Sequence, residues 1–179
     1  MLIHLESYGV LLEQVRDQDL ELIRMWRNSP EIARYMLSQG KITPEMQKEW
    51  FLRINNNQNY YFMVNYDDKH VGVANIANIN YETKIGEPAI YIAYSELQNA
   101  DVSYRAVLCL NDFAFDIIRL SRLEIIILKE NRRAQRFNES IGYELFEKND
   151  RYRHYFLDRP RYLAAALRIK KLLRLPDCA

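Results

Sequence analysis

The chain contains 179 residues with a formal net charge of +1, and 49% of them are hydrophobic and 27% charged, which is the composition of one folded globular domain. Its five glycines, at positions 9, 40, 72, 86 and 142, are too far apart for a Rossmann or P-loop phosphate-binding sequence, which needs glycines about two to five positions apart. The longest uncharged stretch, Ile54 to Tyr66, holds 13 residues and is rich in amides, so it falls well short of the roughly 20 apolar residues of a membrane span.

The N-terminal third contains one predicted strand followed by predicted helices. Leu2 to Val15 is expected to be the strand, and Asp17 or Asp19 then begins a helix with Leu20, Ile23 and Trp26 on one face. Two sequences, Ser29-Pro30-Glu31 and Thr43-Pro44-Glu45, each combine a capping hydroxyl, a proline at the first helical position and an acid in the first turn. Each therefore predicts a helix start, and the second helix is expected to continue through Ile54.

The middle of the chain has the pattern of a hairpin, a further strand and a long helix. Tyr60–Tyr66 and Val71–Asn80 are predicted strands, and the polar turn between them indicates an antiparallel hairpin. A turn over Thr83–Glu87 precedes a predicted strand over Pro88–Ser95. Val102–Arg119 is expected to be a long helix, because its apolar residues at 102, 106, 110, 113 and 117 follow the helical period.

The C-terminal third is expected to contain three more strands and two helices. Leu123–Leu128 is mainly apolar and includes three isoleucines, which indicates a strand buried on both faces. Asn131–Ser140 is predicted to be a short helix, with Gly142 in the left-handed conformation just beyond its end. Tyr143–Glu147 and Tyr152–Leu157 form a second predicted hairpin, and Arg161–Leu173 a final amphipathic helix.

This order of elements predicts a single domain of the α/β (α+β) class. The strand before the long helix and the strand after it are joined by a helical crossover, so they should be parallel neighbours in a mixed, mostly antiparallel sheet. We expect helices on both faces of that sheet. Residues 1–158 would form the domain itself, and residues 159–179 an additional basic helix and tail, packed on the domain or in a dimer.

Cysteine and histidine usage gives no sign of a metal or disulfide framework. Cys109 falls in an apolar helical pattern, which predicts a core residue, and Cys178 lies in the expected tail. The histidines, at positions 4, 70 and 154, have no partner at metal-ligand spacing, so no metal is expected. The sequence shows no signal peptide, and together with the sparse cysteine this predicts a cytoplasmic location.

Charge is unevenly distributed along the chain. From Arg159 to Arg174 there are six basic residues and no acid, so the rest of the chain carries a net charge of about −5. An acidic body disfavours nucleic acid as the partner, although one basic helix can contact phosphates. Three interpretations of that helix stay open: a dimer or docking element, a helix packed on its own domain, or an anchor at a membrane surface. In each, its apolar face would consist of Leu163, Leu167, Leu172 and Leu173.

Three segments together resemble a known family. The first, Met25–Ile32 (MWRNSPEI), is similar to a W-R-N-x-P-x-[IV] motif. The second, Val71-Gly72 followed by Ile85–Ile92 (IGEPAIYI), is similar to a G-x-x-x-[LI] strand and an E-x-G-[IY]-x-[IV] segment. The third, Asn131–Tyr143 (NRRAQRFNESIGY), is similar to an N-x-x-[AS]-x-x-x-x-[EKS]-x-G-[FY] motif. Their order and spacing resemble the GNAT superfamily of acetyl-CoA-dependent N-acetyltransferases over about Leu11–Leu157. The similar branch holds ribosomal-protein N-terminal acetyltransferases and acetyltransferases of nucleotide-activated amino sugars.

This resemblance implies a particular place for acetyl-CoA. The two central parallel strands would splay apart, leaving backbone groups of the first strand to pair with the pantetheine arm. The pyrophosphate would lie at the N-terminus of the long helix, where free N–H groups and the helix dipole favour anions. The residues expected to bind the cofactor are Ile92, Ala93, Tyr94, Gln98, Asn99, Ala100, Asp101, Val102, Ser103, Asn131, Ala134 and Asn138.

Two positions depart from the family pattern. Asp101 and Ser103 replace glycines of the [QR]-x-x-G-x-[GA] loop, and a carboxylate beside a pyrophosphate costs electrostatic energy. Either Asp101 caps the helix with its side chain turned from the cofactor, or cofactor binding is weakened or lost. Asn138 stands where many members have a proton-donating tyrosine; an amide can donate a hydrogen bond but no proton at neutral pH.

The expected reaction is direct attack of a neutral amine on the thioester carbonyl. Glu87 is the candidate base, with an ordinary turn or strand-edge carboxylate as the alternative. Tyr91 and Tyr94 alternate with isoleucines, so a tyrosine face either looks into the acceptor cleft or packs beneath a helix. Tyr94 and Asn138 complete the predicted catalytic set with Glu87.

The acceptor is expected to contact the junction between the first helices. Trp26, Arg27 and Asn28 lie there, and Tyr91 completes the predicted substrate-binding set; capping and ion pairing are the alternative roles of Arg27 and Asn28. The favoured function is an N-acetyltransferase acting on a small amine, an amino sugar linked to a nucleotide ahead of a protein N-terminus. The alternatives are a non-catalytic acyl-CoA-binding or interaction module, motivated by Asp101, Ser103 and Asn138, and a nucleic-acid-binding domain that uses the last helix.

Overall fold

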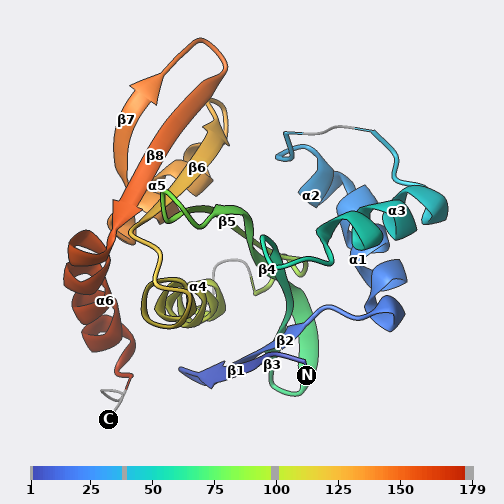
Figure 1. Ribbon diagram of the computed structural model, residues 1–179, viewed down its shortest axis with the longest axis horizontal. Helices are drawn as coiled ribbons and strands as arrows, with labels where there is room; N and C mark the ends of the chain where they lie inside the picture. Colours follow the sequence, from blue (N-terminus) through green and yellow to red (C-terminus); the bar gives the residue numbers. More distant parts are fainter. Residues whose placement is uncertain (1, 38–39, 98–100, 176–179) are drawn as a thin grey trace.

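A single eight-stranded sheet forms the centre of the computed structural model, which describes residues 2–37, 40–97 and 101–175 (Figure 1). The strand order is β1-β2-β3-β4-β5-β6-β8-β7. Neighbouring strands are antiparallel except for β5 and β6, which are parallel, so the predicted mixed sheet with one central parallel pair is confirmed. The strands are β1 (His4–Ser7), β2 (Val10–Gln14), β3 (Tyr60–Tyr66), β4 (Lys69–Asn80), β5 (Ile85–Ile92), β6 (Arg122–Leu128), β7 (Glu144–Lys148) and β8 (Tyr152–Asp158).

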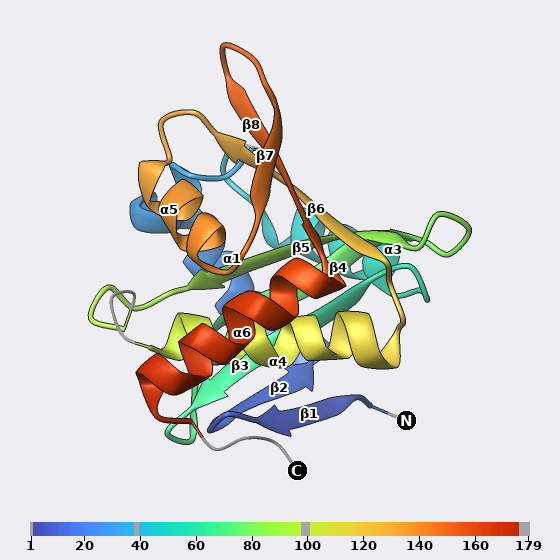
Figure 2. The same ribbon diagram turned by 90° about the vertical axis from the view of Figure 1, so that its left-hand side faces the viewer.

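Helices cover both faces of this sheet, as expected. A 3-10 turn, η1 (Asp17–Asp19), leads into α1 (Leu20–Asn28), α2 (Pro30–Ala33) and α3 (Pro44–Ile54) on one face. The other face carries α4 (Val102–Asp112) with its π-helical end η2 (Phe113–Ile117), α5 (Arg132–Ser140) and α6 (Arg159–Leu173). Figure 2 shows α6 lying across α4. Each face has its own apolar cluster, the larger one around α4 and the smaller one beneath α1 and α3.

No helix within residues 2–37, 40–97 and 101–175 combines the length and apolarity that crossing a membrane requires.

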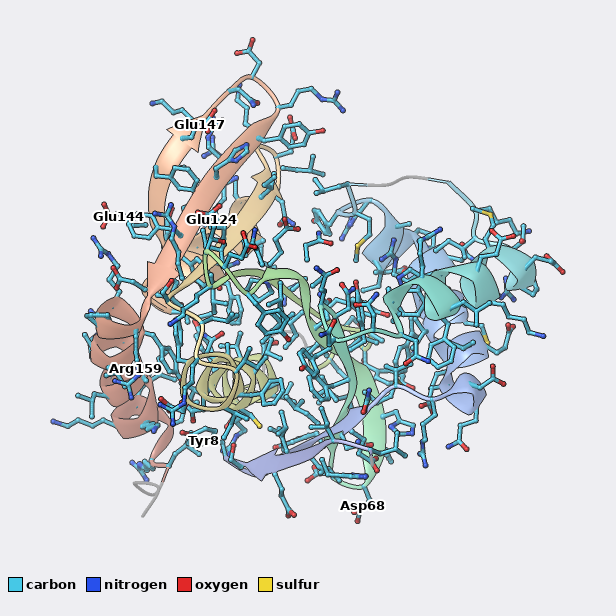
Figure 3. All side chains as sticks on the ribbon, viewed as in Figure 1. Tyr8, Asp68, Glu124, Glu144, Glu147 and Arg159 are labelled. Atoms are coloured by element: carbon cyan, nitrogen blue, oxygen red, sulfur yellow. The ribbon has the colours of Figure 1, made fainter. Side chains whose placement is uncertain are left out.

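The N-terminal segment is a hairpin rather than the single strand predicted over Leu2–Val15. Tyr8 and Gly9 both have positive φ, 57° and 75°, and reverse the chain between β1 and β2. The Tyr8 hydroxyl donates to a carboxylate oxygen of Asp112 on α4, 2.5 Å away, and Tyr162 of α6 donates to the other oxygen at 2.5 Å. A tertiary anchor therefore holds the tyrosine in a conformation that its own sequence does not favour. Figure 3 shows Tyr8 beside α4 and α6.

Both predicted helix starts are present, but only one is capped as expected. Thr43 accepts a hydrogen bond from the backbone N–H of Met46 at the start of α3, which confirms the capping hydroxyl. Ser29 does not cap α2; its hydroxyl donates to the carbonyl of Trp26 in the preceding helix instead. Ser29 therefore closes the tight connection between α1 and α2.

The strand predicted over Pro88–Ser95 begins three residues earlier, at Ile85. The turn ends at Lys84, whose φ is 56° and whose carbonyl accepts from the backbone N–H of Ser121. Glu87 consequently lies within β5 and not in the turn. The long helix predicted to Arg119 ends its α-helical part at Asp112 and continues through η2.

The burial predicted for β6 is wrong. This strand is not buried on both faces: Ile126 is 45% exposed, because no helix covers that side of β6 and β8. Of the apolar face predicted for α6, Leu163, Leu167 and Leu172 are open to solvent, and Leu173 is half-buried against the core. α6 packs on its own domain through the residues between them, Tyr162, Ala165, Ala166 and Ile169. Cys109 is 4% exposed, as a core residue should be.

Candidate active site

β5 and β6 separate almost as soon as they pair. Only Ile85 and Gly86 of β5 have partners in β6, Arg122 and Leu123, although both strands continue for several residues beyond them. This is the splayed parallel pair that the family resemblance implied. Pro88 supplies a local cause, since it follows the last paired residue by two positions and has no N–H to donate to β6.

The separation leaves backbone groups of β5 facing the gap. Ala93 donates its N–H to Val71 of β4, in register with the antiparallel β4–β5 ladder. Because hydrogen bonding alternates along a strand, the odd-numbered residues of β5 face β4, and the N–H of Ile90 faces the gap toward β6. Beyond Gly86 this edge of β5 is not paired with β6, so it is a template for an extended ligand.

The strand register divides the side chains of the separated strands between two faces. Gly86 and Leu123 are parallel partners that point to the α4 side, where a Cβ on Gly86 would come within 2.9 Å of Ile76 and Leu120. Ile85, Glu87 and Tyr91 therefore point to the face that α1 and α3 cover. On β6 and its neighbours the same face has no helix over it, so it forms one open wall beside α1 and α2.

A polar cluster on this face joins α1, β3 and β5. Burial is the main cause that raises the pKa of Tyr61; the charge of Glu87 raises it further, and the charge of Arg27 lowers it. Burial raises the pKa of Tyr91, and the charge of Arg27 opposes that shift. The Tyr91 hydroxyl and Arg27 Nε are both buried without a hydrogen-bond partner in the described part of the chain. Buried polar groups are usually satisfied, so this cluster has hydrogen-bonding capacity to offer a ligand.

Glu87 is held at the edge of this cluster by a β-bulge. The β4–β5 register shifts between Ala77 and Asn80, and Asn78 within the bulge has φ 51°. The Asn78 side-chain amide donates to Glu87 Oε2 at 2.8 Å, while the carboxylate stays exposed to solvent. Bulges commonly redirect a side chain next to an active site. Glu87 is thus accessible and oriented, and sequence reasoning did not find Asn78.

The predicted aromatic residues pack against one another. Trp26 is 9% exposed, and its ring makes edge-to-face contacts with Tyr91 at 6.5 Å and Tyr94 at 6.1 Å between centroids. Tyr94 lies beyond the end of β5 and is 40% exposed. Trp26 therefore packs against the rings of both tyrosines. Its own contact with substrate remains a prediction.

Asn28 holds a loop in place with both ends of its amide. Its Nδ2 donates to the carbonyl of Ile42 at 2.9 Å, and its Oδ1 accepts from the backbone N–H of Ile42 at 2.8 Å. This geometry gives Asn28 a structural role that is neither helix capping nor ion pairing, and both of its polar atoms have a partner. It fixes the segment before α3 against the end of α1.

On the α4 side, Asp101 is neutralised rather than used as a helix cap. Its carboxylate makes no capping hydrogen bond; Oδ2 instead accepts from Arg105 Nε at 2.7 Å and lies 2.6 Å from Arg105 Nη2 in an ion pair. Arg105 Nη1 also donates to the carbonyl of Tyr8. The pair lowers the electrostatic cost expected of a carboxylate at this helix start. Of the two alternatives for Asp101, side-chain capping of α4 is therefore wrong.

The rest of the predicted cofactor loop is only partly placed. Val102 is fully buried and Ser103 half-buried in the first turn of α4. Ile92 is 4% exposed at the end of β5, and Ala93 follows it in contact with the cluster beneath α1. Gln98, Asn99 and Ala100 lie outside the residues that the structure describes.

α5 begins at the carboxyl end of β6 and brings its predicted residues to the same region. Asn131 caps the helix by accepting from the backbone N–H of Ala134 at 3.1 Å. Asn138 donates its side-chain amide to the Ala134 carbonyl at 2.8 Å, so that donor is engaged within the helix. Tyr104 of α4 links to this helix through Ser140, 2.9 Å between hydroxyl oxygens.

An open pocket of about 340 Å³ lies between α2 and the carboxyl end of β6. The segment after α2 contributes Arg34 and Tyr35, and the other residues of its wall are Leu128, Glu130, Asn131 and Arg151. A second pocket, of about 360 Å³, shares Arg34 and adds Asn28, Ala33, Gly40 and Lys41. Apart from Asn28 and Asn131, sequence reasoning did not select these residues. The available signal for Arg34 and Tyr35 was their position directly after the Met25–Ile32 motif.

The uncovered wall of β6, β7 and β8 was also missed. Arg122 lies over the rings of Phe146 and Phe156, 5.0 and 4.2 Å from their centroids, and pairs with Glu124 at 2.7 Å. Figure 3 shows Glu124 on this arm of the sheet. The alternation of side chains along β6 could have indicated one exposed face, but the strand was expected to be buried on both faces.

A family model described as an acetyltransferase (GNAT) domain matches residues 10–144. The chain belongs to this acetyltransferase family. It is 25% identical over 137 residues to acetyltransferase PseH of Campylobacter jejuni, covering 76% of this chain and 83% of that protein. It is 23% identical over 140 residues to spermidine N(1)-acetyltransferase of Escherichia coli K12, covering 78% and 75%.

Solved structures agree with this GNAT fold. FdhC, described as a nucleotide-linked sugar GNAT, aligns with a TM-score of 0.80 over 98% of both chains at 18% identity. Spermidine N-acetyltransferase from Vibrio cholerae, in complex with CoA and spermine, aligns with a TM-score of 0.78 at 21% identity, over 88% of this chain and 99% of that one. The family and fold implied by the three sequence motifs are confirmed.

Proposed function

We propose that this GNAT protein transfers an acetyl group from acetyl-CoA to the primary amine of a small molecule, with a nucleotide-linked amino sugar as its acceptor. The observation that carries the proposal is the early separation of β5 and β6, which pair only at Ile85 and Gly86. Acetyl-CoA is the donor that this family implies, and a relative of the same fold is described in complex with CoA.

In this proposal the pantetheine arm lies along the free edge of β5. The N–H of Ile90 would donate to it, as to a neighbouring strand. The phosphates would approach the first turn of α4, where Val102 and Ser103 provide backbone N–H groups and the Asp101–Arg105 pair leaves no net charge. Asn131 and Ala134 would border the arm from α5.

The chemistry requires a neutral amine and a place for its proton. Glu87 accepts the proton directly or through water as the amine nitrogen bonds to the thioester carbonyl carbon. The resulting oxyanion collapses, the carbon–sulfur bond breaks, and the amide product and the thiolate of CoA separate. Because the Asn138 amide cannot supply a proton, the thiolate leaves as the anion or takes its proton from water.

The acceptor would enter from the face covered by α1. Arg27 and Tyr91 offer buried donors that have no partner in the described part of the chain. Such groups gain most from a ligand that brings hydroxyl or carbonyl oxygens, as a sugar does. Glu87 is exposed at the same face, so an amine held by these two residues would be within reach of the base.

Release of free CoA thiol across a panel of amines tests the proposal. The panel contains UDP-glucosamine, free glucosamine, spermidine and a peptide with a free N-terminus. Turnover of an amino sugar supports it, and turnover of the peptide alone would identify a protein N-terminal acetyltransferase instead. Tight CoA binding without turnover of any amine would favour a non-catalytic acyl-CoA-binding module.

The cellular setting follows from the donor. A reaction that consumes acetyl-CoA fits the predicted cytoplasmic location. A homodimer through α6 stays a prediction, and the exposed Leu163, Leu167 and Leu172 are the residues that it would cover.

A further inference from the structure

Two arginines line the pocket between α2 and the end of β6. Arg34 comes from the segment after α2, and Arg151 from the turn between β7 and β8. Six arginines of the described chain form an ion pair with a carboxylate, at positions 16, 24, 105, 122, 159 and 161. Arg34 and Arg151 have no carboxylate partner among the residues that the structure describes.

Each of these two guanidinium groups is supported by the tyrosine next to it in the chain. The Arg34 guanidinium carbon lies 4.6 Å from the centroid of the Tyr35 ring, and that of Arg151 lies 5.3 Å from the centroid of the Tyr152 ring. Stacking on a ring occupies one face of the guanidinium and leaves its N–H edge free. Two such edges in the lining of one pocket suit a ligand with several anionic oxygens.

The charge around Arg34 favours the same ligand. The second pocket shares Arg34 and adds Lys41, so three cations line the two adjoining pockets against one acid, Glu130. A polyamine would be repelled by this set, whereas a diphosphate would be attracted. The single carboxylate of Glu130 can accept hydrogen bonds from the hydroxyls of a ribose or a sugar.

We infer that Arg34 and Arg151 bind the diphosphate of a nucleotide-linked acceptor. Arginine binds phosphate oxygens through two parallel N–H donors, which makes it the preferred cation for this task. A volume of about 340 Å³ lies near the lower end of the range for small-molecule sites, enough for a diphosphate and part of the groups attached to it. The inference rests on the proposed acetyl transfer and names the part of the acceptor that this pocket recognises.

The test measures binding of UDP while CoA saturates the donor site, so that UDP cannot occupy the place of the CoA phosphates. Calorimetric titration of the wild-type chain should give a UDP dissociation constant below about 1 mM. Arg34→Met and Arg151→Met should each weaken UDP binding about tenfold or more, with CoA affinity changed less than twofold. Arg53→Met on α3 is the matched control, since it removes an exposed arginine outside both pockets. It should leave both affinities unchanged.

Three results would overturn this inference. UDP fails to bind in the presence of CoA, or it binds equally well to the two pocket variants, or the variants lose CoA affinity, which would assign the pocket to the donor. Thermal unfolding confirms that each variant folds. If UDP does not bind but spermidine or a free amino sugar is acetylated, only the inference fails. If UDP binds as expected but no amine releases CoA thiol, the proposed acetyl transfer fails and the phosphate site stands.

Discussion

The Asp101–Arg105 pair makes an electrostatic prediction that separates charge from structure. In the wild-type chain Arg105 Nε and Nη2 lie 2.7 and 2.6 Å from Asp101 Oδ2, so the start of α4 carries no net side-chain charge. Asp101→Asn leaves Arg105 unpaired and adds one positive charge near the proposed phosphate position. Arg105→Met leaves Asp101 unpaired and adds one negative charge. The two variants should therefore change CoA affinity in opposite directions.

The magnitude follows from Coulomb's law at a partly exposed site. The side chains of Arg105 and Asp101 are 20% and 29% exposed, so the effective dielectric constant lies between the protein and water limits. For charges about 6 Å apart and an effective dielectric constant of about 50, Coulomb's law gives about 1 kcal/mol. This energy corresponds to roughly a fivefold change in the dissociation constant. Asp101→Asn should bind CoA about three- to tenfold more tightly, and Arg105→Met about three- to tenfold more weakly.

Calorimetric titration with CoA at low and high salt provides the assay. Both effects should shrink at 0.5 M salt, where the Debye length falls to about 4 Å. The double variant should return close to the wild-type affinity. Arg105→Lys is the control for the lost hydrogen bond to Tyr8, because it retains the charge. Two variants that shift affinity in the same direction, or an Asp101→Asn effect that does not depend on salt, would refute the electrostatic explanation.

Three further predictions concern the base, the packing of the sheet and the response to alkali. Glu87→Gln should lower kcat about 10²- to 10⁴-fold with the acetyl-CoA KM within twofold; an unchanged kcat in steady-state thiol release would mean that another group takes the proton. Gly72→Ala places a Cβ 2.1 Å from the Tyr91 carbonyl oxygen and should destabilise the fold by about 1–3 kcal/mol in urea titration, and wild-type stability would contradict the packing described here. Burial, with the hydrogen bond to Glu139, raises the pKa of Tyr155 from 10.0 to about 12. The contribution of Tyr155 to the free energy of unfolding should therefore be constant below pH 10 and be lost as the pH rises toward 12, because the unfolded chain loses its proton first. Urea titrations from pH 8 to 11 should show a shallower fall for Tyr155→Phe, and an identical slope would show that this tyrosine does not contribute.

The parallel pair could be predicted because a strand, a long helix and a second strand in this order specify a parallel crossover. The splay between the two strands was implied by the family resemblance alone, and Pro88, which removes a donor where pairing with β6 stops, is a local cause that the sequence analysis did not use. The capping hydrogen bond of Thr43 is likewise local, because its partner Met46 lies three residues along the chain, and the structure confirms Thr43 as the cap of α3. Gly142 has φ 104° just beyond α5, as a residue that ends a helix should.

The features that escaped prediction depend on contacts between distant parts of the chain. Tyr8 adopts a positive φ because Asp112 and α6 hold its ring and hydroxyl, and no neighbour in sequence reveals this. Asp101 does not cap α4 because Arg105 competes for its carboxylate. Arg34 and Arg151 meet only when α2 and the β7–β8 turn come to the same end of β6.

The side of α6 that packs on the domain could not be chosen from periodicity, because both sides of the helix carry apolar residues. Tyr162, Ala165, Ala166 and Ile169 form the packed side, and Leu163 and Leu167 remain in solvent. The small Ala165 and Ala166 allow close approach of the helix to the domain.

Hydrogen exchange at the Ile90 amide tests the slot between β5 and β6 most directly. That N–H faces the gap, whereas the N–H of Tyr91 pairs with β4, so the two neighbours report on opposite edges of one strand. Saturation with CoA should slow exchange at Ile90 at least tenfold and leave Tyr91 nearly unchanged. If CoA binds and the exchange rate at Ile90 stays as it was, the pantetheine arm does not pair with β5, and the account of the donor site is wrong.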